Sequence, residues 1–226
     1  MNSSVSDQQL PGYATRWKGL LFIGVSVIVI SLDNTVLNTA LPLISRVLGA
    51  TTNELQWIVD AYILVFASLL LTTGSLGDRF GRKTALQFGL VWFAVGSMAA
   101  AFVTNTTMLI VLRGIIAIGG ALILPATLSI ISASFPVKER AQAIAIWAGL
   151  FALGSGIGPV IGGFLLQHFA WNSVFLINLP TCAIALIGGA FFLANSKDEH
   201  APAIDIPGVI LSVSPTGSAP ERSSAN

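Results

Sequence analysis

The chain has 226 residues, of which 54% are hydrophobic and only 9% are charged, and its formal net charge is +1. A soluble globular protein is about one quarter charged, so this composition excludes an ordinary water-soluble domain. The small net charge argues against a nucleic-acid partner. The apolar runs are continuous rather than alternating, which disfavours a β-barrel and predicts an all-α integral membrane protein surrounded by the lipid bilayer.

Six apolar segments follow one another, each close to the ~20 residues that a membrane span requires. Residues 1–16 are predicted to form a disordered cytoplasmic segment ahead of them. The first apolar run is too long for a signal peptide, so we expect it to be retained as a helix. The predicted transmembrane domain is residues 17–194, with helices at about 17–41, 55–76, 84–103, 108–135, 141–168 and 173–194.

Basic residues are concentrated on one side of the predicted membrane, before the first helix, in alternate connections and after the sixth helix. They are Arg16, Lys18, Arg79, Arg82, Lys83, Lys138, Arg140 and Lys197. The other connections hold Arg46 and His168. The positive-inside rule therefore predicts that both termini are cytoplasmic in a multi-pass protein of the cell (plasma or inner) membrane.

The segment GSLGDRFGRK, Gly74–Lys83, gathers four charges in an otherwise apolar region. Glycines at 74, 77 and 81 are expected to allow a tight turn between the second and third helices. A similar pattern without the charges occurs at Gly163–Asn172, which predicts that helices 1–3 and 4–6 are inverted three-helix repeats. Such repeats are typical of secondary transporters.

Three ionisable residues, Asp33, Asp60 and Arg113, lie within predicted spans. A charge at mid-bilayer costs at least ~2.5–3.5 kcal/mol, so each must face water, a cavity or a partner. Asp60 is predicted near the outer surface, where water reaches it, and it is also a candidate residue of a substrate and proton path. Asp33 lies deeper, in a polar run with Asn34 and Asn38. Two compatible interpretations stay open for this run and Arg113: a buried polar network that locks helices 1 and 4 together, or the lining of a substrate and proton path.

Helix 5 carries the sequence GSGIGPVIGG, in which Gly154, Gly158 and Gly162 share one face. Small residues at that spacing let another helix approach closely, and Pro159 removes a backbone donor and kinks the helix. Ordinary tight packing is one interpretation, and a seal and hinge that changes between conformations is the other. The sequence shows no catalytic set, metal cluster or phosphate loop, so we expect no enzyme.

Together these segments resemble the major facilitator superfamily, specifically its 14-helix drug:proton antiporters. GSLGDRFGRK is similar to the signature between helices 2 and 3, and LDNTVLNTALP, Leu32–Pro42, to a helix 1 signature. Arg113 matches the arginine of the helix 4 signature, although Ile116 replaces the usual glutamine three residues later. GSGIGPVIGG is similar to the helix 5 antiporter signature, and WNSVFLINLP to the start of helix 6.

The resemblance implies export of an amphipathic drug or metabolite in exchange for protons, with the proton gradient as energy source, no cofactor and no metal. It implies that Asp33 lies in the central cavity and that Arg113 takes part in proton coupling. The residues implied for a cytoplasmic gate are Gly74, Asp78, Arg79, Gly81, Arg82 and Lys83. Those implied for the antiporter motif are Gly154, Gly158, Pro159, Gly162 and Gly163.

Members of that family have twelve to fourteen helices in two halves around a central path, and these six correspond to the N-terminal half. Residues 195–226 are predicted to be a polar cytoplasmic tail that starts like helix 7 at Asp205 and then changes composition, as after a reading-frame shift. Two hypotheses follow. The chain is a proton-coupled exporter that works as a homodimer or with a second half-chain, or it is a non-transporting truncated fragment with a structural or interfering role.

Overall fold

The computed structural model describes residues 10–194, except for the side chains of residues 71, 75, 76 and 78–80. The predicted tail and residues 1–9 of the predicted N-terminal segment lie outside this range. Every element within it is a helix. The elements are a short 3₁₀ turn η1 (Tyr13–Thr15), α2 (Arg16–Leu48), α3 (Thr52–Phe80), α4 (Arg82–Ala100), α5 (Thr106–Ser134), α6 (Val137–His168), α7 (Ser173–Leu176) and α8 (Asn178–Phe192).

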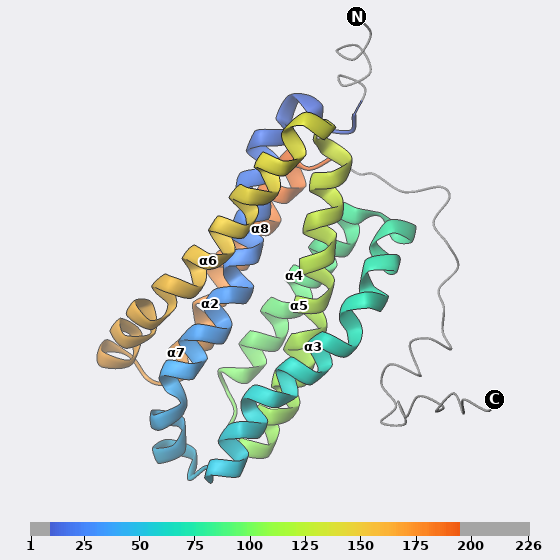
Figure 1. Ribbon diagram of the computed structural model, residues 1–226. Coiled ribbons are helices and arrows are strands. Elements are labelled where there is room, and N and C mark those ends of the chain that lie inside the picture. Colours follow the sequence, from blue (N-terminus) through green and yellow to red (C-terminus); the bar gives the residue numbers. More distant parts are fainter. Residues whose placement is uncertain (1–9, 195–226) are drawn as a thin grey trace, which may run out of the picture.

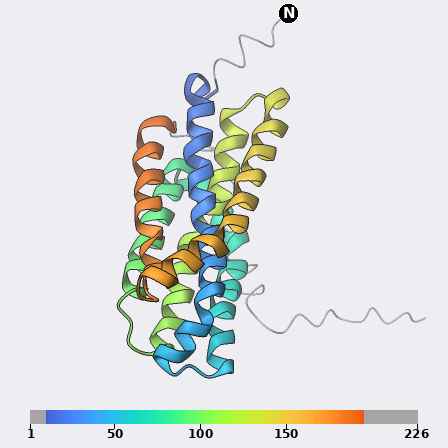
Figure 2. The same cartoon turned by 90° about the vertical axis from the view of Figure 1, so that its left-hand side faces the viewer.

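The long helices lie side by side in an elongated bundle, with α6 and α3 at its two sides and α2 and α5 between them (Figure 1). α2 packs mainly against α6 and α8, whereas α5 packs mainly against α3 and α4 (Figure 2). In two inverted three-helix repeats, α2 corresponds to α5 and α6 corresponds to α3, so the two main pairings are equivalent. The arrangement agrees with the predicted repeat.

Most of these helices are long enough to cross a membrane. Five described helices are long and apolar enough to cross a membrane, namely those that begin at Tyr13, Thr52, Thr106, Val137 and Ser173. α4 is not among the five, because Arg82, Lys83 and Gln87 occupy the beginning of its 19 residues. Its apolar remainder still lies inside the bundle against α5 and α8.

Local signals explain where several helices begin. Thr51 and Glu54 form a reciprocal capping box at the start of α3, which satisfies two backbone donors that a helix start leaves free. At α5, the side chain of Asn105 accepts from the backbone N–H of Met108 at 2.8 Å. Pro136 precedes α6, where its missing N–H costs no helical hydrogen bond, so α6 begins at Val137 rather than at the predicted 141.

Two predicted helix ends are wrong because the helices continue further. α2 runs past Pro42 to Leu48, since one proline removes a single helical hydrogen bond and the chain reverses only at Gly49, which has φ 67°. α3 runs through Gly74 and Gly77 to Phe80, and only Gly81, with φ 107°, makes the turn. The predicted three-glycine turn is therefore a one-residue turn.

The sixth predicted helix is present as one apolar segment, Ser173–Phe192, with a one-residue interruption, whereas the predicted disordered start is partly ordered. Ile177 separates α7 from α8 because Pro180 has no N–H to donate to the carbonyl of Leu176. At the other end, Tyr13–Thr15 forms an ordered turn. The Arg16 guanidinium stacks 3.7 Å above the Tyr13 ring centroid, and Thr15 donates to the carbonyl of Phe192 at 3.1 Å.

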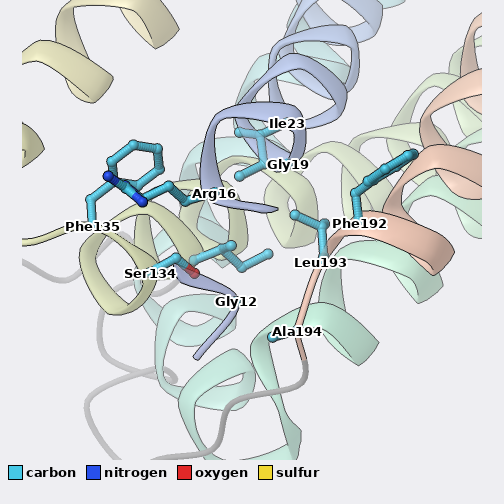
Figure 3. Close-up of a pocket in the computed structure, with 10 residues that line it drawn as sticks. Gly12, Arg16, Gly19, Ile23, Ser134, Phe135, Phe192, Leu193 and Ala194 are labelled. Carbon is cyan, nitrogen blue, oxygen red and sulfur yellow. The ribbon is translucent and has the colours of Figure 1, made fainter. Parts of the chain in front are cut away.

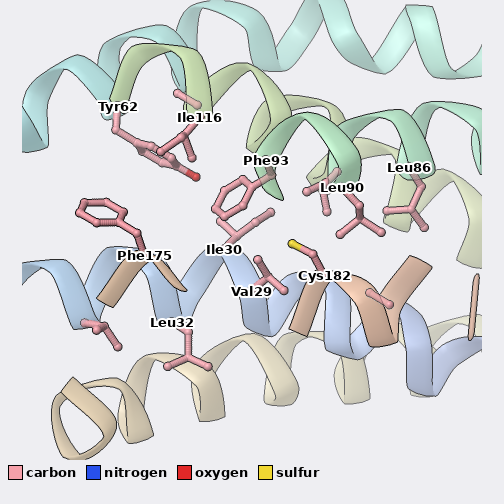
Figure 4. Close-up of a cluster of buried hydrophobic side chains, with 14 of the residues drawn as sticks. Val29, Ile30, Leu32, Tyr62, Leu86, Leu90, Phe93, Ile116, Phe175 and Cys182 are labelled. Carbon is pink, nitrogen blue, oxygen red and sulfur yellow. The ribbon is translucent and has the colours of Figure 1, made fainter. Parts of the chain in front are cut away.

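The interior of the bundle is apolar and draws on most of the helices. Buried side chains of α2, α4, α5, α7 and α8 meet in one cluster, among them Ile30, Phe93, Ile116, Phe175 and Cys182 (Figure 4). Lipid tails are as apolar as these side chains, so close van der Waals packing rather than exclusion of water holds the helices together. A polar group in this interior therefore needs a specific partner.

Candidate functional site

A buried ion pair joins α2 and α5 at the centre of the bundle. The Arg113 side chain is fully buried and Asp33 is 2% exposed. The guanidinium Nη1 donates to Oδ2 of Asp33 at 2.5 Å. The residues are 80 positions apart in the chain, so only the folded bundle brings them together. An ion pair without access to water requires further hydrogen bonds to offset the loss of hydration.

The remaining faces of the Arg113 guanidinium are occupied as well. Its Nη2 donates to Oδ1 of Asn34 at 3.3 Å, and its Nε donates to the carbonyl of Ile58 at 3.3 Å. The ring of Tyr62 lies against the guanidinium plane, 4.3 Å from its Cζ, in cation–π geometry. α2, α3 and α5 therefore all contribute to binding this one cation.

The second oxygen of Asp33 is held from the other side of the bundle. Nδ2 of Asn178, the first residue of α8, donates to Oδ1 of Asp33 at 2.7 Å. The same amide nitrogen lies 3.2 Å from Oγ of Ser97 on α4. Asn178 is 1% exposed and Ser97 is fully buried. The network formed by Asp33, Asn34, Tyr62, Ser97, Arg113 and Asn178 thus connects five helices, and we call it the central polar network.

Three of these six side chains were not candidates from the sequence. Asn178 is the first polar residue after the apolar run Val174–Ile177, and polar groups inside a membrane segment find partners, so this signal was present. Ser97 and Tyr62 gave no comparable signal, because serine bonds readily to its own helix and tyrosine is common in apolar segments.

Two predicted path residues lie outside the network. Asn38 is exposed on α2 and donates to the carbonyl of Asn34 at 2.9 Å. Asp60 is exposed on α3, which agrees with its predicted access to water. The structure therefore brings together Asp33, Asn34 and Arg113, and their role in a substrate or proton path stays a prediction.

The charged segment at the junction of α3 and α4 contacts the end of α8. The Nζ of Lys83 donates to the carbonyl of Ala190 at 2.7 Å, close to the C-terminus of that helix. A cation at this position satisfies a free carbonyl and interacts favourably with the helix dipole. The side chains of Asp78 and Arg79 lie outside the described part of the chain. The predicted gate role of this segment stays a prediction.

The predicted glycine face of α6 packs against α2. A Cβ on Gly154, Gly158 or Gly162 would meet the side chains of Ser31, Thr35 and Thr39 respectively. Glycines and hydroxyl residues therefore alternate in register along the two helices. Gly163 differs, since a Cβ there would meet nothing within 4 Å, and Pro159 is exposed.

The cavities of the described bundle include two that do not contain the central polar network. One, of about 10 Å³, lies at the basic end between α2, α5 and α8 and is lined by Arg16, Phe135 and Phe192 among others (Figure 3). It has room for about one water molecule. The other, of about 410 Å³, is an open groove on α4 and α8, and the residues that line it are Ala94, Val95, Met98, Ala99 and Leu179. Its lining offers no polar side chain to orient a ligand.

Comparison with known proteins identifies the kind of protein to which this bundle belongs. The model of the Major Facilitator Superfamily matches residues 23–220. The chain belongs to this superfamily. Its resemblance to superfamily signatures is thereby confirmed, and the bundle is the six-helix half of the major facilitator fold.

Several curated superfamily members share clear sequence identity with this chain. The multidrug efflux pump LfrA of Mycolicibacterium smegmatis is 41% identical over 197 residues, which cover 87% of this chain and 39% of LfrA. The methyl viologen resistance protein SmvA of Salmonella typhimurium is 45% identical over 172 residues, covering 76% of this chain and 35% of SmvA. The riboflavin transporter RibZ of Clostridioides difficile is 36% identical, covering 89% of this chain and 44% of RibZ.

A solved transporter structure has a similar fold. The peptide transporter POT superposes with a TM-score of 0.61 over 80% of this chain and 40% of POT, at 16% identity. At that identity the similarity concerns the fold alone. The chain thus spans well under half the length of each relative named here. It is a multi-pass membrane protein of a transporter family.

Proposed function

We propose that the chain forms one half of a proton-coupled exporter of amphipathic small molecules in the plasma membrane. The observation that carries the proposal is the Asp33–Arg113 pair, an ion pair with no access to water in membrane-spanning helices of a transporter family. Buried intramembrane charges are costly and mark ion paths and substrate sites. Three relatives are named for multidrug efflux, methyl viologen resistance and riboflavin transport, which suggests flat organic molecules, including cations, as substrates.

The transport path of this proposal needs a second half, because the superfamily relatives are more than twice as long as this chain. A second copy of the chain or a separate half-chain would supply it. Chemical cross-linking in native membranes tests for the homodimer, which appears as a band at twice the chain mass.

Energised inverted membrane vesicles test the transport itself. We expect vesicles containing the chain to accumulate ethidium, methyl viologen or riboflavin when a proton gradient is present, and a protonophore to abolish the uptake. Arg113→Lys keeps the charge but loses the planar set of donors that bonds to Asp33, Asn34 and the Ile58 carbonyl at once, and we expect it to reduce uptake strongly. Gradient-dependent uptake equal to that of empty vesicles, with the chain alone and with a co-expressed second half, would contradict the proposal and favour the non-transporting alternative.

We further propose that the end of the bundle that carries Arg16, Lys83 and Arg140 faces the cytoplasm. The support is the clustering of basic residues at this end. Exposed positions at the two ends, Lys18 and Ala170, suit cysteine labelling, since the native Cys182 is fully buried and does not interfere. An impermeant thiol reagent applied to intact cells should label Ala170→Cys and spare Lys18→Cys.

A further inference from the structure

The two oxygens of Asp33 have different partners, and this difference decides where a proton can bind. Oδ2 accepts from Arg113, and Oδ1 accepts from Asn178. Both partners donate, so a proton that takes the lone pair which one of them now occupies displaces that partner. A proton on either oxygen neutralises the carboxylate, but displacing Arg113 would also break the hydrogen bond of a fully buried guanidinium, whereas displacing the amide N–H breaks one hydrogen bond to a neutral group.

Asn178 can also accept a hydrogen bond from the O–H group of a protonated Asp33. Rotation about its Cβ–Cγ bond exchanges the NH₂ group and the carbonyl oxygen, so the oxygen takes the place where Nδ2 now lies. That place is 2.7 Å from Oδ1 of Asp33 and 3.2 Å from Oγ of Ser97. The Ser97 hydroxyl both donates and accepts, so it can bond to the amide in either orientation.

We propose that Asn178 is a positioning residue for proton binding, and that the proton binds Oδ1 of Asp33 while Arg113 stays on Oδ2. The step adds one proton and forms one O–H bond. The carboxylate loses its negative charge, and the O–H donates to the rotated Asn178 amide, which in turn accepts from Ser97. This inference rests on the proposed proton path and assigns a role to Asn178, a residue of WNSVFLINLP for which the sequence analysis gave none.

The groups that surround Asp33 favour proton binding on the side that faces Asn178. Among the described side chains, the charged or titratable groups around it are Arg113 of α5, Tyr62 of α3 and Cys182 of α8. α4 contributes the neutral Ser97, and α6 faces the opposite side of α2. Asn178 begins α8 just after the break at Ile177, where a short helix precedes it, so its side chain stands at a joint rather than in mid-helix.

Infrared difference spectroscopy on the purified full chain in lipid tests the inference without any transport. Lowering the pH should produce a carboxylic acid C=O band that Asp33→Asn abolishes. Asn178→Leu removes the acceptor of the O–H group, so this band should move to higher frequency. Ser97→Ala should cause a smaller shift in the same direction, and Cys182→Ala, one turn along the same buried face, should cause none.

The inference is overturned if no Asp33 band appears in the wild type, or if the band in Asn178→Leu stays where it was. A loss of thermal stability without a band shift indicates a purely structural role and also overturns it. If Asn178→Leu does not fold, Asn178→Ser keeps a small hydroxyl partner and should shift the band less.

The efflux assay adds a second readout that separates this inference from the proposed function. Asn178→Leu should lower the maximal rate roughly tenfold, the effect of losing one hydrogen bond to a charged group, while the half-saturating substrate concentration stays unchanged. Wild-type chain that shows no efflux would contradict the proposed function, and the infrared result would still decide the role of Asn178.

Discussion

α2 meets its neighbours in two different ways on two of its sides. Toward α5 and α8 it presents Asp33 and Asn34, whose polar atoms bond to side chains of other helices. Toward α6 it presents hydroxyls that bond back to α2 itself, as when Thr35 donates to the carbonyl of Ser31 at 2.9 Å and Thr39 to that of Thr35 at 3.1 Å. We call the side of α2 that faces α5 and α8 the polar side, and the side that faces α6 the glycine side.

The difference predicts two kinds of sensitivity. On the polar side the contact depends on matched charges, so removing one partner leaves the other buried without compensation. On the glycine side the hydroxyls are already satisfied and offer α6 only their surface, so the contact depends on shape. Loss of charge should damage the first contact, and added volume should damage the second.

The largest effect is expected from breaking the ion pair on the polar side. Arg113→Leu leaves the Asp33 carboxylate buried without its counter-ion, and we expect a loss of about 3–5 kcal/mol in stability. Thermal unfolding of the purified chain in detergent measures this loss. The double variant Asp33→Asn with Arg113→Leu should be more stable than Arg113→Leu alone. Additive losses would contradict a direct interaction between the two residues.

The next effect concerns the glycine side, where the expected order of damage follows the space at each position. A Cβ at Gly158 would lie 2.6 Å from the Cβ of Thr35, which no rotation of that side chain can relieve. At Gly154 the clash is with the Ser31 hydroxyl, which can turn away, and the next atom is at 3.3 Å. We expect Gly158→Ala to cost about 1–3 kcal/mol and Gly154→Ala less.

Gly163→Ala is the matched control, because it adds the same methyl group to the same helix with nothing within 4 Å. Its unfolding temperature should equal that of the wild type. Thr35→Gly should restore part of the stability lost in Gly158→Ala. Equal losses from Gly158→Ala and Gly163→Ala would mean that contact with α2 does not set the cost, because the higher helix propensity of alanine favours both substitutions.

The two sides of α2 were not equally predictable from the sequence. Asp33 and Arg113 stood out because lipid tolerates few charges, and the physical need for a partner is the same in any fold. The glycine spacing indicated that another helix approaches α6 closely, but a four-residue spacing does not identify which helix that is. That α2 supplies Ser31, Thr35 and Thr39 in register follows only from the assembled bundle.

Long-range partners and helix ends were the least predictable features. Asn178 bonds to Asp33 across 145 positions of the chain, and no local pattern encodes such a pairing. The length of the predicted turn between the second and third helices was overestimated for another reason. Three glycines permit a loop but do not require one, and two of them, Gly74 and Gly77, remain helical while Gly81 alone takes a positive φ.

A moderate effect is expected at the aromatic face that supports Arg113. Tyr62 is 2% exposed, its hydroxyl has no hydrogen-bond partner among the described residues, and its ring stacks on the guanidinium. Tyr62→Phe keeps the ring and removes the unsatisfied hydroxyl, so its stability should equal or exceed that of the wild type. Tyr62→Leu should lose about 1–2 kcal/mol through the cation–π contact. A greater loss in Tyr62→Phe than in Tyr62→Leu would show that the hydroxyl, not the ring, holds Arg113.

The smallest effect is expected from an ion pair that joins the starts of α2 and α6. Nε of Arg16 lies 2.8 Å from Oε2 of Glu139, and Nη2 lies 3.1 Å from Oε1, so the geometry is two-pronged. Both side chains keep contact with solvent, 14% for Arg16 and 32% for Glu139, and water and salt screen the attraction. Glu139→Gln should therefore leave the unfolding temperature almost unchanged.

This pair sharpens the distinction between the two sides of α2, because it is a charge contact located on the glycine side. If shape alone holds α6 to α2, Glu139→Gln combined with Gly158→Ala should be no less stable than Gly158→Ala alone, at low and at high salt. A marked further loss in the double variant at low salt only would show that the ion pair stabilises the same interface and that the glycine side is partly electrostatic.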